Sequence, residues 1–125
     1  MGGFQLLVAN DDERMSISVI DPSKKEHPLH YWDVVTPFMS TLGEVAEWRV
    51  VKRRKRIVPI ALIVSLKSLD QSDPEHPKEV PLIAVAKITD REICVVAALP
   101  ASRWPIERVR QEADNSADKA CLSAP

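Results

Sequence analysis

The chain contains only 3 glycines among its 125 residues, and aromatic residues make up only 5% of it. So few glycines leave no Gly-rich loop to hold a nucleotide phosphate and no Gly-x-Ser-x-Gly turn to present a nucleophilic serine. Scarce aromatic rings argue against a single-strand nucleic-acid binder, which stacks bases on such rings. Nucleotide hydrolysis and serine-hydrolase chemistry are therefore disfavoured.

A long hydrophobic run is also lacking. The longest apolar stretch, residues 57–66, includes Pro59 and is much shorter than the roughly 20 residues that a membrane span requires. Residues 5–9 are apolar, but no basic segment precedes them, so they do not resemble a secretory signal. We therefore expect no membrane association.

The chain has 2 cysteines in different settings. Cys94 falls in the apolar run 93–96 and is typical of a small core residue, whereas Cys121 falls in a polar tail. These settings do not suggest a disulfide framework, and the sequence thus favours a reducing compartment. We expect the protein to be cytoplasmic.

The remaining composition, 45% hydrophobic and 28% charged, is typical of a soluble globular protein. The length favours one domain. Residues 1–113 carry the apolar patterns and are predicted to form a single α+β domain. Residues 114–125 are small and polar, and we expect a disordered tail there.

Several segments have the pattern of strands. Residues 15–20 alternate apolar and small polar side chains and are predicted to pair with residues 4–9 in a hairpin. Residues 57–66 are rich in β-branched residues and apolar at successive positions, as in a strand buried on both faces. Residues 80–88 and 92–99 predict a second hairpin.

Two segments have the pattern of helices. Thr36 and Pro37 suit the start of a helix, and apolar residues follow at helical spacing, namely Phe38, Leu42, Val45 and Ala46. Whether residues 45–51 continue this helix or begin a strand stays open. Residues 101–113 place Ile106, Val109 and Ala113 on one helix face.

The predicted fold class is therefore α+β, a mostly antiparallel sheet of about five strands with one central and one C-terminal helix, in the order β-β-α-β-β-β-α. The strands are too apolar for a sheet with one face in water. We expect the second face to be covered by a homodimer partner or to line a cavity.

One segment concentrates positive charge. Six of the 17 cationic residues fall within residues 49–56, which contain no acid: Arg49, Lys52, Arg53, Arg54, Lys55 and Arg56. Guanidinium groups bind phosphates through paired hydrogen bonds, so this segment is a candidate contact surface for nucleic acid or another anionic partner. Two other interpretations stay open: cations guarding the apolar strand that follows, or pairing with the protein's own acids at residues 11–13 or 70–79.

Other chemistry is weakly indicated. Tyr31, Trp32, Phe38 and Trp48 are candidates for an apolar pocket between helix and sheet. Ligand-type side chains recur at three-residue spacing in two Pro-rich loops: His27, His30 and Asp33, then Asp70, Asp73 and His76. Such loops are usually solvated, and we predict no metal, no cofactor and no catalytic residue.

The sequence thus favours a small binding protein, without catalytic activity, that contacts nucleic acid or an acidic protein through residues 49–56. One alternative is a small-molecule-binding or enzymatic α+β fold that uses the apolar pocket. A second alternative is a structural or assembly module without a ligand.

Overall fold

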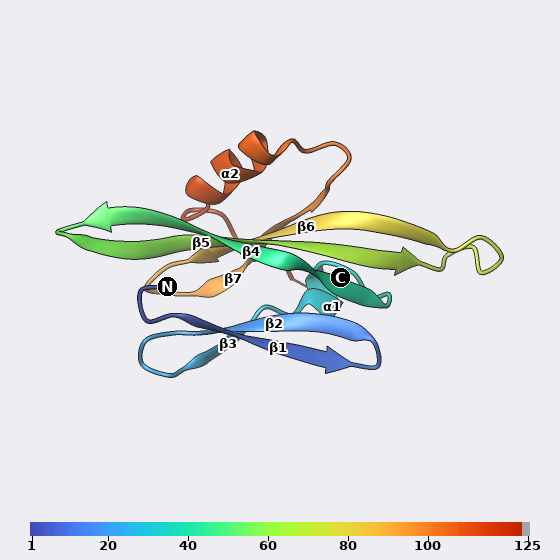
Figure 1. Ribbon diagram of the computed structural model, residues 1–125, viewed down its shortest axis with the longest axis horizontal. Helices are drawn as coiled ribbons and strands as arrows, with labels where there is room; N and C mark the ends of the chain where they lie inside the picture. Colours follow the sequence, from blue (N-terminus) through green and yellow to red (C-terminus); the bar gives the residue numbers. More distant parts are fainter. Residues whose placement is uncertain (124–125) are drawn as a thin grey trace.

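The computed structural model describes residues 1–123, apart from the side chain of Val45. The chain forms one seven-stranded sheet with two helices beside it (Figure 1). The elements are β1 (Gln5–Asp11), β2 (Arg14–Ile20), β3 (Glu26–Pro28), α1 (Tyr31–Val34), β4 (Ser40–Arg53), β5 (Arg56–Asp70), β6 (Lys78–Ile88), β7 (Ile93–Pro100) and α2 (Ile106–Asp114). The strand order is β1-β2-β4-β5-β6-β7, and β3 pairs with the second edge of β2.

The protein is mostly β, so the predicted α+β class with about five strands and a central helix is wrong. The predicted hairpins are present, because β1 pairs with β2 and β6 pairs with β7, in both cases antiparallel. The C-terminal helix is present as α2. β5 contains the predicted strand 57–66 and continues to Asp70.

The central helix was misread because its apolar residues recur every four positions. Phe38, Leu42 and Ala46 share one side in a helix, but a spacing of four also places residues on one face of a strand. The chain forms β4 from Ser40 onward, and Leu42, Ala46 and Trp48 pack on the core. The β4–β5 register shifts between Leu42 and Ala46. Gly43 lies within this shift, where a Cβ atom would sit 3.1 Å from the Ser65 carbonyl oxygen.

The central strands of the sheet are buried on both faces by other parts of the chain. On one face, alternate β5 residues Leu62, Val64 and Leu66 pack with β2 and with Tyr31 of α1. On the other face, Ala61 and Ile63 pack with Val109 and Ala113 of α2. The predicted covering of the second face by a dimer partner or a cavity is corrected for these strands, because α2 lies there, and the homodimer itself stays a prediction.

The segment that follows α2 returns to the sheet. Cys121 forms a disulfide with Cys94 of β7, so the expectation that these two cysteines are unpaired is wrong. The Leu122 amide donates to the Val95 carbonyl at 2.8 Å, and the buried Lys87 ammonium donates to the Lys119 carbonyl at 2.6 Å. These contacts place residues 119–122 of the predicted tail 114–125 against β6 and β7, and residues 124 and 125 lie outside the description.

Candidate anion-binding site

Five of the six predicted site cations lie at the end of the β4–β5 hairpin, which forms one end of the long axis of the molecule (Figure 1). We call these residues the basic tip, and all five are exposed: Lys52, Arg53, Arg54, Lys55 and Arg56. Arg53 and Arg56 are the last paired residues of the two strands. Arg54 and Lys55 form the two-residue turn between them.

The turn holds two cationic side chains in a backbone conformation that non-glycine residues seldom adopt. Arg54 has φ of 48° and Lys55 has φ of 66°. Two-residue hairpin turns with positive φ at both positions strongly prefer Asn-Gly or Asp-Gly, because a β-carbon is crowded there. Residues such as Arg54 and Lys55, which occupy a strained backbone conformation, cluster at functional sites in proteins.

Arg49, the sixth predicted cation, is neutralised by the protein's own acids. Its Nε and Nη2 atoms donate to the two carboxylate oxygens of Asp114 at 2.8 and 2.9 Å. Its Nη1 atom donates to Glu47 at 3.2 Å. Glu47 also accepts two bonds from Arg110, at 2.8 and 2.9 Å. This network joins β4 to α2, so Arg49 fixes the helix and does not belong to the basic tip.

The network changes the pKa values of its members in the directions that ion pairing requires. Hydrogen bonds from Arg110 hold the pKa of Glu47 below its usual value, and the Arg49 guanidinium does the same to the pKa of Asp114. The Asp114 carboxylate raises the pKa of Arg49, and Glu47 raises that of Arg110. Glu47 and Asp114 are therefore ionised in the folded protein at neutral pH.

The basic tip has no such compensation. No ion pair within 4.0 Å involves residues 52–56 in the described part of the chain. A hollow of about 790 Å³ beside the tip is lined by Arg53 and Arg56 and by four acids that form no ion pair with them within 4.0 Å, namely Asp21, Asp90, Glu92 and Asp114. The β1–β2 turn, which carries the acids at residues 11–13, lies on the side of the molecule away from the basic tip (Figure 1).

The four aromatic residues predicted to line a pocket are dispersed. Tyr31 is buried in the core, and its burial raises the pKa of the phenol. The Trp32 ring stacks under the Arg14 guanidinium, 5.2 Å from the ring centroid. Trp48 packs against Phe4 with ring centroids 6.3 Å apart. None of the four lines the cavities of about 500, 790 and 660 Å³ found among the described residues.

The histidine-containing loops each form local contacts instead of a shared site. His27 pairs with Asp21 at 2.9 Å, and this bond, with help from Ser23, holds the pKa of Asp21 far below its usual value. His76 pairs with Asp73 at 3.1 Å. Because each pair joins residues no more than six positions apart in the chain, these contacts stabilise local conformations.

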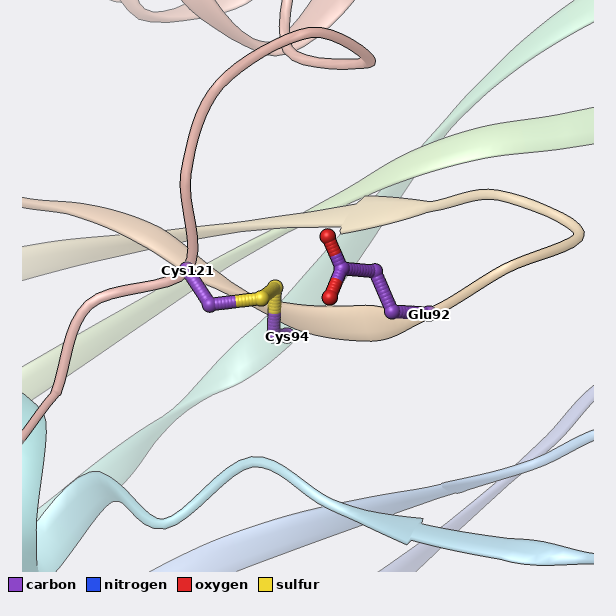
Figure 2. A group of neighbouring side chains, drawn as sticks. All are labelled: Glu92, Cys94 and Cys121. Atoms are coloured by element: carbon purple, nitrogen blue, oxygen red, sulfur yellow. A yellow bond between two sulfur atoms is a disulfide. The ribbon is translucent and has the colours of Figure 1, made fainter.

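One group of metal-ligand types lies together in the described residues: Glu92, Cys94 and Cys121. Figure 2 shows the Glu92 carboxylate beside the disulfide that joins the two cysteines. Both sulfur atoms are therefore bonded to each other, and Glu92 pairs with the Lys87 ammonium at 2.6 Å. A positive side chain at this place opposes cation binding, so we assign the group a structural role.

Two features of the site were missed by sequence reasoning. The disulfide was missed because Cys121 follows a polar segment, and the pairing of Arg49 was missed because Asp114 was expected to begin a disordered tail. Neither helix of the described chain has the length and apolar character needed to cross a membrane.

Comparisons with protein-family models, with curated proteins and with solved structures found no match to this chain.

Proposed function

We propose that this protein is a binding protein without catalytic activity, whose basic tip contacts the phosphates of a nucleic acid. The observation that carries the proposal is the placement of five exposed cations, without ion pairs in the described structure, at the end of one hairpin. Holding like charges together is unfavourable unless an anionic partner neutralises them. Three of the five are arginines, whose planar guanidinium groups bind phosphate oxygens in pairs.

The shape of the tip favours double-stranded nucleic acid over a single strand. Two antiparallel strands end in a two-residue turn, and the major groove of B-DNA admits a ribbon of this width. No aromatic residue lies within residues 52–56, so the tip offers no ring on which a base could stack. The contact we propose is therefore to the phosphate backbone.

The charge of the remaining chain orients such a contact. Outside the tip, the sequence has 12 cations and 18 acids, a balance of −6. A polyanion is therefore repelled by most of the surface and attracted at one end. Electrostatic steering of this kind raises association rates and falls steeply with salt.

The test is binding of fluorescent duplex DNA, measured by anisotropy, to the wild type and to the variant Arg53→Glu/Arg54→Glu. We expect the variant to lose affinity by about tenfold or more. The matched control is Lys78→Glu/Arg103→Glu, which makes the same change in net charge at exposed positions outside the tip. Equal losses in both variants would show that net charge, not the tip, governs binding.

Two further outcomes separate the alternatives. Binding of a polyacidic protein without binding of duplex DNA or RNA would identify an acidic protein as the partner. Binding of no polyanion at all would leave a structural or assembly role.

The disulfide favours an oxidising compartment, in contrast to the cytoplasm expected from the sequence.

A further inference from the structure

A second hairpin turn has the same construction as the basic tip but the opposite charge. β1 and β2 are joined at the pair Asp11↔Arg14 by Asp12 and Glu13, whose φ angles are 54° and 61°. Both turns thus place long or charged side chains in the left-handed region, where Asn-Gly is the unstrained choice. The two hairpin turns therefore share one strained backbone conformation and carry opposite charges.

The acidic turn lies on the side of the molecule away from the basic tip, toward the end of the long axis that the β5–β6 loop forms (Figure 1). The β5–β6 loop extends at the same end and carries Asp73 and Glu75, both exposed. Arg14 compensates Asp11 weakly, at 3.9 Å. Asp12 and Glu13 form no ion pair within 4.0 Å in the described residues. The molecule therefore has a positive end and a negative end.

A cleft of about 500 Å³ lies at the negative end, beside the acidic turn. It lies where β2 meets β4, around the single pair Arg14↔Ser40, and residues of β5 and β6 line its other side. Its apolar lining comes from Met15, Met39 and Leu69.

The charged groups of the cleft leave an excess of one negative charge. Glu13 lines it without an ion partner, whereas Lys67 and Glu79 pair with each other at 3.3 Å. An arginine or lysine side chain has an apolar stem and a charged end, and it suits a cleft with apolar walls and an acidic rim.

We propose that the basic tip of one copy docks at the acidic turn and cleft of a second copy. Tip cations would place their stems against the methionine-lined wall and their charged ends near Asp12 and Glu13. The proposal rests on the premise, shared with the proposed function, that the tip cations are free to bind. The partner is a second copy of this chain, in which Asp12 and Glu13 lie beside the cleft.

The symmetry of this contact differs from that of a dimer that joins identical faces. Tip and cleft are different surfaces, so the contact can be used in two ways. Two antiparallel copies form it twice and close as a two-fold dimer, whereas copies in head-to-tail order form a heterologous contact once per neighbour and grow. In both arrangements a nucleic acid bound at the tip competes with self-association.

The test is sedimentation velocity of the full chain at about 0.01 M and about 1 M salt, where the screening length falls from roughly 30 to 3 Å. We expect concentration-dependent association at low salt and a monomer at high salt. The tip variant Arg53→Glu/Arg54→Glu, which lowers the tip charge from +5 to +1, and the turn variant Asp12→Lys/Glu13→Lys should each be monomeric. An equimolar mixture of the two should associate again, because the turn variant keeps the basic tip and the tip variant keeps the acidic turn.

A wild type that stays monomeric at low salt would overturn the proposal, as would variants that associate like the wild type. A milder variant, Asp12→Asn/Glu13→Gln, keeps the test valid if the lysine variant does not fold, since asparagine tolerates positive φ. The turn variants retain the basic tip, so their binding of duplex DNA reports on the proposed function separately. DNA binding without self-association removes only this inference, and self-association without DNA binding removes only the nucleic-acid function.

Discussion

Arg49 and Asp114 lie 65 positions apart in the chain and form two parallel hydrogen bonds of 2.8 and 2.9 Å. This pair divides a segment that is continuous in sequence into two parts with different roles. Arg49 joins α2 to β4 through its carboxylate partners, whereas the cations of residues 52–56 form no ion pair within 4.0 Å in the described structure. The basic tip therefore consists of five residues and not six.

Asp114→Asn should destabilise the protein at neutral pH without weakening polyanion binding. Pairing lowers the pKa of Asp114, so the folded protein binds fewer protons than the unfolded chain near the ordinary value of 3.8. The stabilisation is therefore complete above that value and is lost as the pH falls through the lowered pKa. We expect a loss of about 1 kcal/mol at pH 7 that shrinks in acid, measured by urea unfolding across pH. A constant difference at all pH values would contradict this account.

Reduction of the Cys94–Cys121 disulfide should destabilise the protein substantially. The bond closes a loop across a sequence separation of 27 residues, for which loss of unfolded-chain entropy predicts about 3–4 kcal/mol. The melting temperature should fall in reductant, and the variant Cys94→Ala/Cys121→Ala should melt at the reduced value and not respond to reductant. A wild type whose melting is equal with and without reductant would show that the bond does not form.

The only tyrosine of the chain, Tyr31, should titrate far above its ordinary pKa of 10.0, because burial disfavours the phenolate. Absorbance near the phenolate band should rise only as the protein unfolds in alkali. Its hydroxyl is buried without a hydrogen-bond partner in the described structure, so Tyr31→Phe should be neutral or stabilising. The contrasting variant is Ser68→Ala, which breaks the buried 2.6 Å bond to Thr36 and should cost about 1–2 kcal/mol. Ordinary titration of Tyr31 in the folded protein would show that α1 does not pack as described.

Replacing the β4–β5 turn by Asn-Gly, as Arg54→Asn/Lys55→Gly, should stabilise the protein while weakening polyanion binding. Both residues have positive φ, which asparagine and glycine adopt with little strain, and a gain of about 1–2 kcal/mol is expected. The two readouts are the urea midpoint and the affinity for duplex DNA. Stabilisation with unchanged affinity would assign the two turn cations no role in binding.

Local patterns in the sequence predicted those elements whose partners are close in the chain. The β1–β2 and β6–β7 hairpins and α2 follow from alternation, turn residues and helical spacing over short distances. β4 was lost because a spacing of four residues fits both a helix and a strand, and its partner β5 decides between them. The run of cations at residues 52–56 is visible in the sequence itself, but the pairing of Arg49 depends on a contact with Asp114, 65 positions away.

The most direct test of the binding claim is the salt dependence of duplex DNA affinity. Each phosphate contact contributes a slope of about −0.9 to the logarithm of affinity against the logarithm of salt concentration. Five tip cations therefore predict a slope of up to roughly −4.5, and Arg53→Ala/Arg54→Ala should reduce its magnitude to roughly −2.7. A wild-type slope near zero, or a slope that the double substitution leaves unchanged, would contradict the account of residues 52–56 as the contact surface.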